Sequence, residues 1–269
     1  MASGLSYRFT DALLRLPASS VTEGLRAIDS GEPDITLFLS EHNDYANALQ
    51  DAGVTTEILP SLPEFPDSVF IEDSALCLPK GAIALRPGAP SRTGESVVVY
   101  DTLKHYYENV ETVADNGFIE GGDILLTDRE ILVGLSSRTD EAGFLNLKKI
   151  VEDWGYNIRM LQTPSGILHF KTACGILDGD TIFATRPMID SGTLDGYQLI
   201  RVPEGEEAAA NIIRVNNTVL VSDGYPKSAE TISNAGYKVS IVPTSQAALL
   251  DGGLSCMSLR FHNAGSDDS

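Results

Sequence analysis

Pairs of short apolar runs joined by turn residues recur along the chain. They occupy residues 69–87, 117–136, 167–185 and 211–224, as in the stretch NIIRVNNTVLVSDG. β-Branched apolar residues on both sides of a Gly, Asn or Asp turn are typical of a β-hairpin. We therefore predict a hairpin in each of these four stretches.

Helical periodicity follows several of these hairpins. In residues 143–161 one face of the pattern is apolar and comprises Phe144, Leu147, Ile150, Val151 and Trp154. Gly155 then supplies a C-cap, and the apolar run after it indicates a short strand. Residues 44–60 and 228–243 repeat this plan, with Gly53 and Gly236 in the capping role. The recurring unit is therefore a hairpin, a helix and a strand.

One polar or thiol side chain marks the start of the hairpin in each unit. These positions are Glu72, Glu120, His169, Asn211 and Cys256, at intervals of 48, 49, 42 and 45 residues by subtraction. Five units of similar length fill the chain, which favours a closed ring over an open stack. We expect one α/β domain over residues 1–269, the alternative being an ordinary α/β fold with coincidental spacing. A closed ring would bring the marked positions to one axis.

Composition and charge narrow the class of protein. The chain has 269 residues, 42% of them hydrophobic, and shows no apolar run of membrane-spanning length. Its net charge is −19, from 38 acidic and 19 basic residues, so it would repel phosphate backbones and anionic bilayers. We expect a cytoplasmic monomer or homodimer that binds a small molecule, and neither nucleic acid nor membrane. The acidic field either attracts a cationic substrate or serves only solubility.

The cysteine pattern argues against disulfides and metal. Cys77, Cys174 and Cys256 form no CxxC pair and no Cys/His cluster of zinc spacing. Taken alone, Cys256 is typical of a buried structural thiol and His169 of a core histidine. The joint occurrence of a Cys, a His and the acidic Glu120 at equivalent points of a repeat, near glycines that admit a ligand, favours a nucleophilic site instead.

Five sequence blocks resemble a known enzyme family. FIED, RPGAPSRTGE, EGGDILLTDREILVGLSSRT, LHFKT and DGGLSCMSLRF follow, in this order, the blocks of the dimethylarginine dimethylaminohydrolases of the guanidine-modifying superfamily. The resemblance implies a five-bladed pseudo-symmetric α/β propeller (the pentein fold), in agreement with the five units above. It also implies hydrolysis of Nω,Nω-dimethyl-L-arginine and Nω-methyl-L-arginine to L-citrulline and dimethylamine or methylamine, with no metal and no organic cofactor.

The same resemblance implies the catalytic roles. Cys256 would be the nucleophile, His169 the general acid and base, and Glu120 the acidic partner of the histidine. Thiolate addition to the guanidine carbon, with protonation of the departing amine, would leave a covalent thiouronium that water then hydrolyses. Because a free thiol is mostly protonated at neutral pH, a nearby imidazolium or the cationic substrate must favour the thiolate.

Substrate contacts are implied at both ends of the ligand. A planar guanidinium requires carboxylates in its plane, and Asp73 with its neighbour Glu72 matches that site. The resemblance assigns further contacts: Asp67 for the α-ammonium group, Arg92 and Arg138 for the carboxylate, and Leu16 in a mobile loop near residues 16–22. Without the resemblance, the acidic pair would indicate a solvated turn and the arginines surface ion pairs.

Other functions fit parts of this pattern. Arginine deiminases use a similar Cys, His and acid set, but they carry an additional helical domain for which this chain has no length. Agmatine deiminases act on a substrate without a carboxylate and would not need Arg92 and Arg138. A non-catalytic five-bladed propeller of the ribosome anti-association factor type lacks the triad. Alkylation of Cys256 that arginine analogues prevent would separate an enzyme from such a binding protein.

Overall fold

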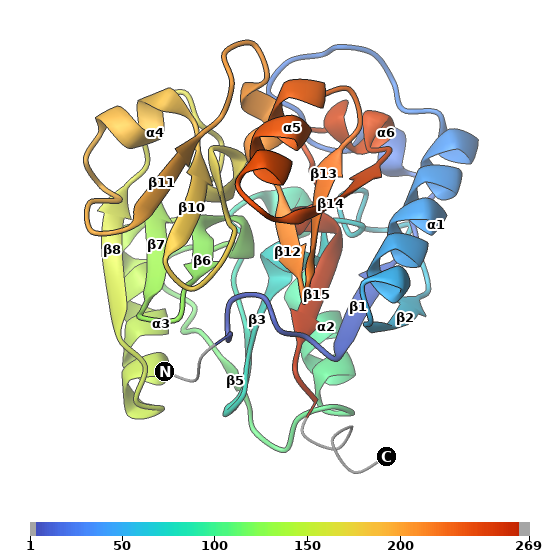
Figure 1. Cartoon of the computed structure of the whole chain (residues 1–269). Helices are drawn as coiled ribbons and strands as arrows, with labels where there is room; N and C mark the ends of the chain where they lie inside the picture. Colours follow the sequence, from blue (N-terminus) through green and yellow to red (C-terminus); the bar gives the residue numbers. More distant parts are fainter. Residues whose placement is uncertain (1–3, 264–269) are drawn as a thin grey trace.

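One three-stranded unit is repeated around the molecule. The computed structural model describes residues 4–263, whose strands form five three-stranded sheets (Figure 1). In each sheet the middle strand pairs antiparallel with one neighbour and parallel with the other. The sheets form a five-bladed pseudo-symmetric α/β propeller, which confirms the predicted fold class.

The blades share one order of elements. Their strands are β1 (Asp11–Arg15), β2 (Thr55–Leu59) and β15 (Ser258–Phe261); β3 (Ala75–Leu78), β4 (Gly81–Ala84) and β5 (Val110–Thr112); β6 (Ile124–Leu126), β7 (Ile131–Leu135) and β8 (Ile158–Gln162); β9 (Cys174–Ile176), β10 (Thr181–Ala184) and β11 (Gln198–Arg201); β12 (Ile213–Val215), β13 (Thr218–Ser222) and β14 (Lys238–Val242). A helix links each middle strand to its parallel neighbour: α1 (Ile35–Asp51), α2 (Glu95–Leu103), α3 (Glu141–Asp153), α4 (Arg186–Asp190) and α5 (Pro226–Asn234). A short helix, α6 (Ser245–Ala248), follows β14.

A 3-10 turn precedes the first hairpin strand of every blade. These turns are η2 (Ile71–Ser74), η4 (Gly121–Asp123), η5 (Phe170–Thr172), η6 (Glu207–Ala210) and η7 (Ser255–Met257); two more, η1 (Val21–Glu23) and η3 (Pro90–Arg92), lie elsewhere. The five marked positions lie in these turns or directly beside them. The starts of the predicted hairpins are therefore turns and not strands. The turns satisfy their own backbone groups, as when the Asp123 N–H donates to the Glu120 carbonyl (3.0 Å).

The two ends of the described chain complete one blade. Strand β15 pairs antiparallel with β1, with Asp11 opposite Phe261 and Leu14 opposite Ser258. This pairing closes the ring, because β1 also pairs in parallel with β2. It also brings Cys256, in the turn η7 that directly precedes β15, to the same axis as the turns of the other blades.

Helix α3 illustrates how the local sequence selects these elements. Asp140 caps its first turn by accepting the Gly143 N–H (2.7 Å). Its inner face consists of buried Phe144, Leu147 and Val151 and partly buried Ile150 and Trp154. Burying each such side chain contributes roughly 1.5–3 kcal/mol. Gly155, Gly53 and Gly236 end their helices with φ of +80°, +89° and +96°, which confirms their predicted capping role.

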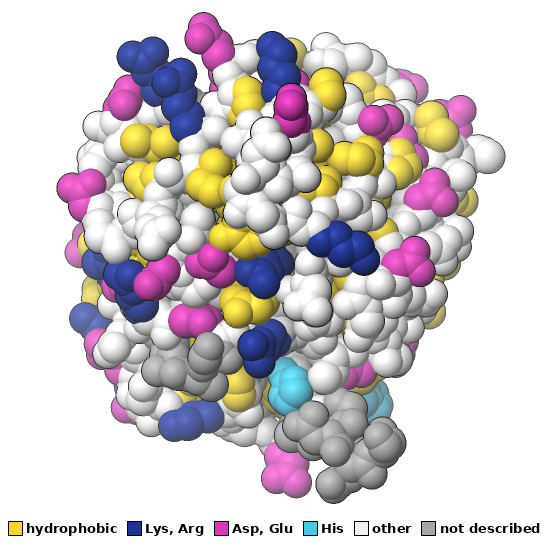
Figure 2. Space-filling model, viewed as in Figure 1, with side chains coloured by type: hydrophobic (Ala, Val, Ile, Leu, Met, Phe, Trp, Pro, Cys, Tyr) yellow, Lys and Arg dark blue, Asp and Glu magenta, His cyan; other side chains and the backbone are white. Residues whose placement is uncertain are grey.

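The surface shows no segregation of charge on the face drawn in Figure 2. Acidic and basic side chains are scattered over it, with hydrophobic side chains between them (Figure 2). Among residues 4–263, no helix combines the length and the apolar character that a membrane crossing would need.

Candidate active site

The short turns of neighbouring blades meet near the axis of the propeller. Turn η2 contacts η4 and η7, and η4 also contacts η5 and η7. A cavity, here called the catalytic cavity, lies beside them and is lined by Leu25, Asp67, Phe70, Asp73, Arg92, Arg138, Leu168, His169, Leu250, Asp251, Gly252 and Cys256. Six of the nine residues predicted for the site are in this lining, although the sequence separates them widely.

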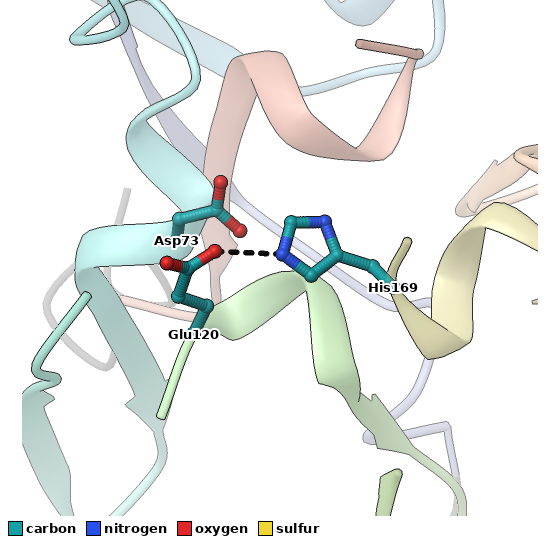
Figure 3. Close-up of side chains that lie close together, drawn as sticks. All are labelled: Asp73, Glu120 and His169. Atoms are coloured by element: carbon teal, nitrogen blue, oxygen red, sulfur yellow. Dashed lines mark hydrogen bonds and ion pairs between the residues drawn. The ribbon is translucent and has the colours of Figure 1, made fainter. Parts of the chain in front are cut away.

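His169 and Glu120 form a buried pair. The Nε2 of His169 lies 2.7 Å from Oε2 of Glu120, whose side chain is fully buried (Figure 3). Burial lowers the pKa of His169, but the negative charge of Asp73 and the hydrogen bond to Glu120 outweigh it and raise the pKa to about 9. The ring is therefore an imidazolium at neutral pH, and its other nitrogen, Nδ1, is left to serve as an acid.

Asp73 is a buried anion beside this pair. Its Oδ2 accepts a hydrogen bond from Nη1 of Arg92 (2.6 Å), and its Oδ1 accepts one from the Gly122 N–H (2.9 Å). Burial favours the neutral acid, but the positive charges of His169 and Arg92 outweigh it and lower the pKa of Asp73 to about 2. An ionised carboxylate at this place suits a cationic ligand.

Gly122 is required by the close packing of these groups. A Cβ at this position would lie 2.8 Å from the His169 ring and 2.9 Å from Oδ1 of Asp73. At the preceding position, a Cβ on Gly121 would lie 1.9 Å from the carbonyl oxygen of Glu72. The glycine pair therefore lets the backbone of one blade approach side chains of two others.

Cys256 lies in η7 and is 8% exposed. Its N–H donates to the Gly253 carbonyl (3.2 Å), and Nδ2 of Asn211 lies 3.9 Å from its Sγ. Burial and the negative charge of Asp73 raise the pKa of the thiol to about 12. The thiol is therefore protonated in the ligand-free cavity, and a bound cation is needed to stabilise the thiolate.

Asp67 offers an unused acceptor next to the cavity. Its Oδ1 accepts the Leu25 N–H (2.9 Å), whereas its buried Oδ2 has no hydrogen-bond partner within residues 4–263. Burial raises the pKa of this carboxyl, although the charge of Arg92 opposes the shift. A buried carboxylate oxygen without a partner is costly, and a ligand ammonium group would satisfy it.

The two predicted arginines differ in their availability. Arg92 is 4% exposed, and its Nε and Nη2 donate to Glu95 at 3.0 and 2.8 Å while Nη1 donates to Asp73. Arg138 has a side chain that is 20% exposed and lies 3.7 Å from Oε1 of Glu120. Arg138 is thus the more accessible fork for a carboxylate, and Arg92 also holds Asp73 in place.

The structure places Glu72 outside the lining of the catalytic cavity. Its Oε1 accepts a hydrogen bond from Nη2 of Arg260 (2.7 Å) and forms an ion pair with Nζ of Lys171 (2.6 Å). Together with these two residues and Ser255 it lines a second cavity, here called the axial cavity. Successive residues of η2 face different cavities, so Asp73 reaches the catalytic cavity while Glu72 is engaged in an ion network.

Leu16, the residue predicted for a mobile loop, also lies outside the lining of the catalytic cavity. Leu16 directly follows β1, where its N–H donates to the Leu59 carbonyl (3.1 Å), and it is 36% exposed. Leu25 takes its place at the catalytic cavity, where its N–H holds Asp67. Sequence reasoning also missed Leu250. Neither leucine belongs to a periodic run that would have marked it, since both lie in loops.

Asp73, Glu120 and His169 have ligand atoms within 4.8 Å of one another, which is close enough to surround a metal ion. Each of these groups is already engaged, however: Asp73 with Arg92, and Glu120 with His169. A metal would also require a neutral imidazole, whereas His169 has a pKa of about 9. The arrangement therefore suits proton transfer beside a nucleophile better than metal binding.

Comparisons with known proteins agree with this geometry. Residues 29–222 match the family model described as N,N dimethylarginine dimethylhydrolase, eukaryotic. The chain is 37% identical to the N(G),N(G)-dimethylarginine dimethylaminohydrolase of Pseudomonas aeruginosa over 94% of its length and all of that protein, and 31% identical to the Streptomyces coelicolor protein of the same name over 93% and 96%. A crystal structure of a mutant of the P. aeruginosa protein, in complex with citrulline, superposes with a TM-score of 0.92 over 95% of this chain and all of that one.

Proposed function

Because the chain belongs to the dimethylarginine dimethylaminohydrolase family, we propose that it hydrolyses Nω,Nω-dimethyl-L-arginine to L-citrulline and dimethylamine, and Nω-methyl-L-arginine to L-citrulline and methylamine. The observation that carries the proposal is the lining of the catalytic cavity. A cysteine and a protonated histidine lie there beside two buried carboxylates and an accessible arginine. These groups match the thiol chemistry and the three charges of the substrate.

Charged side chains recognise the substrate at each of its two ends. Asp73, ionised at neutral pH, faces the guanidinium, and the unpartnered oxygen of Asp67 accepts the α-ammonium group. Arg138 binds the α-carboxylate. Arg92 contributes to the same group only through N–H groups that do not already donate to its other partners. Leu25 lies at the amino-acid end of the substrate, because its N–H donates to Asp67. With the substrate held in this orientation, the guanidinium carbon lies on the side of Cys256.

The first half of the reaction forms a covalent adduct. The guanidinium lowers the cost of ionising the Cys256 thiol, which releases its proton to solvent as the cation binds. The thiolate sulfur adds to the guanidinium carbon and forms a C–S bond. His169 then gives its Nδ1 proton to the dimethylated nitrogen as the C–N bond breaks, so dimethylamine departs and a thiouronium remains on the sulfur.

The second half regenerates the enzyme. Neutral His169 takes a proton from water as the hydroxyl adds to the thiouronium carbon. The tetrahedral adduct then collapses: the C–S bond breaks, the hydroxyl proton of the adduct passes to the departing sulfur, and citrulline leaves. Cys256 is again a thiol and His169 again carries its proton. Glu120 holds Nε2 of the ring throughout and stabilises the imidazolium.

We further infer the domain organisation, location and partners of this enzyme. The propeller acts as one catalytic domain on a small molecule, in the cytoplasm, as a monomer or homodimer. Its net charge of −19 supports the absence of a nucleic-acid or membrane partner, because phosphate groups would be repelled.

The test is a citrulline assay of the purified protein with dimethylarginine, monomethylarginine and arginine. Cys256→Ser is expected to lose at least about 99% of turnover, because a serine hydroxyl is not ionised near neutral pH. Cys77→Ala is the matched control, since Cys77 is a buried thiol in β3 outside the lining of the catalytic cavity. No citrulline from wild type, or equal loss in both variants, would refute the proposal.

A further inference from the structure

The turn that carries Cys256 is held from its other side by an arginine. Arg260, in β15, donates through Nη1 to the carbonyl oxygens of Ser255 and Ser258, both at 3.0 Å, and to Oγ of Ser258 at 2.7 Å. Ser255 is the residue directly before the nucleophile. Nη1 of Arg260 therefore hydrogen-bonds to the backbone on both sides of Cys256.

A tyrosine from another element also hydrogen-bonds to the backbone beside this turn. Tyr45 of α1 is fully buried, and its hydroxyl donates to the Leu254 carbonyl at 2.8 Å. The same hydroxyl lies 2.6 Å from Oγ of Ser258. The carbonyls of the two residues before Cys256 are thus each fixed by a side chain from outside the turn, and Ser258 links the two side chains.

Glu72 orients the guanidinium. Its Oε1 accepts a hydrogen bond from Nη2 of Arg260 at 2.7 Å and lies 2.6 Å from Nζ of Lys171 in an ion pair, so two cations share one carboxylate oxygen. Glu72 is 5% exposed, and the Arg260 side chain is 12% exposed. Because Nη1 and Nη2 are rigidly related, fixing one on Glu72 aims the other at the turn.

We propose that Arg260 is a positioning residue for the nucleophile: its guanidinium, oriented by Glu72 and assisted by Tyr45, fixes the turn Ser255–Met257 and so the place of the Cys256 sulfur. The inference rests on the proposed function, and it gives Glu72 a role in the reaction without substrate contact. Among the described residues that line the catalytic cavity, none belongs to this network of Tyr45, Glu72, Ser258 and Arg260.

A distinct kinetic signature follows from this placement. The groups that bind the substrate lie on the catalytic cavity, whereas the network acts only on the backbone of η7. A nucleophile displaced by a fraction of an ångström reacts more slowly, but the substrate still binds. Loss of the network is therefore expected to lower kcat and to leave KM almost unchanged.

The experiment compares Arg260→Lys with Arg214→Lys in the full-length protein. Lysine keeps the charge but lacks the fork, so it cannot hold Glu72 and the Ser255 carbonyl together. Arg214 is the matched control, because it also lines the axial cavity but donates to the carbonyls of Leu177 and Asn216. For Arg260→Lys, kcat should fall about ten- to hundredfold with KM within about threefold of wild type; Arg214→Lys should keep kcat within roughly twofold.

Amide hydrogen exchange gives a readout that does not need turnover. Arg260→Lys should speed exchange in the peptide that contains residues 253–257, and Arg214→Lys should not. If wild type makes no citrulline, the proposed function fails, while this exchange measurement still decides whether Arg260 fixes the turn. Unchanged exchange in 253–257, unchanged kcat, or a rise in KM alone would overturn the inference.

Tyr45→Phe keeps the proposal testable if Arg260→Lys does not fold. This variant removes only the hydroxyl that holds the Leu254 carbonyl, so kcat should fall several-fold, roughly 1 kcal/mol, with KM unchanged. Tyr197→Phe is its control, since the Tyr197 hydroxyl bonds instead to Thr127 and Glu130. Equal kcat in the two tyrosine variants would overturn the inference.

Discussion

Single residues of the site owe their charge states to one another. Asp73 is anionic because His169 and Arg92 lie beside it, and His169 is cationic because Asp73 and Glu120 outweigh the effect of burial. Cys256 stays a thiol beside these acids until a cation binds. The reactive form of the nucleophile therefore depends on the substrate, which limits reaction with other electrophiles in the ligand-free protein.

Stability should depend on pH through His169. Its pKa is raised from 6.5 to about 9 in the fold, so protonation stabilises the fold fully below about pH 6.5, and this contribution is lost as pH rises through about 9. Between these limits the unfolding free energy of wild type should fall by about 2–3 kcal/mol more than that of His169→Gln. Urea unfolding over a pH series measures the difference; parallel curves for the two proteins would contradict it.

Selectivity should separate the two ends of the substrate. Arg138→Ala is expected to reduce kcat/KM for dimethylarginine by roughly 2–4 kcal/mol, because the α-carboxylate loses its accessible fork. The decarboxylated analogue should be a poor substrate of wild type and should lose much less in this variant. Asp73→Ala should harm both substrates, since both carry the guanidinium. Equal losses for the two substrates in Arg138→Ala would show that the assigned orientation is wrong.

Among the elements, the 3-10 turns have the most demanding geometry. Each turn brings a polar side chain to the axis at the point where its blade begins, and η4 also passes so close to its neighbours that it needs two glycines. The helices and outer strands have a different task, because their apolar faces form the cores between blades. Activity and stability should therefore respond differently to changes in these two kinds of element.

Gly122→Ala tests this difference. The added Cβ would meet the His169 ring at 2.8 Å, so the ring or the turn must shift. We expect kcat/KM to fall by about ten- to hundredfold and the unfolding free energy by about 1–3 kcal/mol. Gly236→Ala is the control, because its φ of +96° makes an alanine strained but its Cβ has open space. It should lose about 1 kcal/mol of stability and keep the wild-type kcat/KM; equal kcat/KM in both variants would refute the role of the turn.

At the scale of the whole molecule, the acidic excess acts on a substrate of opposite charge. The net charge is −19, and acidic side chains are spread over the face in Figure 2. Such a field raises the encounter rate of a cationic substrate without any specific contact, and salt screens it.

Added salt should therefore lower kcat/KM, which includes the encounter with the substrate, more than it lowers kcat. Raising the ionic strength from about 0.02 M to about 0.3 M is expected to lower kcat/KM for dimethylarginine by about two- to fivefold, with kcat nearly constant. Steady-state assays in sodium chloride measure both constants. A fall of kcat by the same factor would mean that the screened interaction lies in the site and not in the approach to it.

Local sequence patterns were enough to predict the repeated unit and the chemistry of the site. Apolar periodicity and capping glycines depend on neighbours close in the chain, so they predicted α3 and the hairpins, and the spacing of Glu120, His169 and Cys256 placed them at equivalent points of a ring. The motif blocks pointed to the family for the same reason, since a motif is a local pattern.

The way those residues face one another depends on the tertiary fold. It places Glu72 against Arg260 and outside the lining of the catalytic cavity, because adjacent residues of a 3-10 turn point in different directions. It placed Leu25 instead of Leu16 at the catalytic cavity, and the bond from Leu25 to Asp67 joins residues 42 apart. The protonation states were also beyond the sequence, since the pKa of a buried group depends on charges that other blades supply.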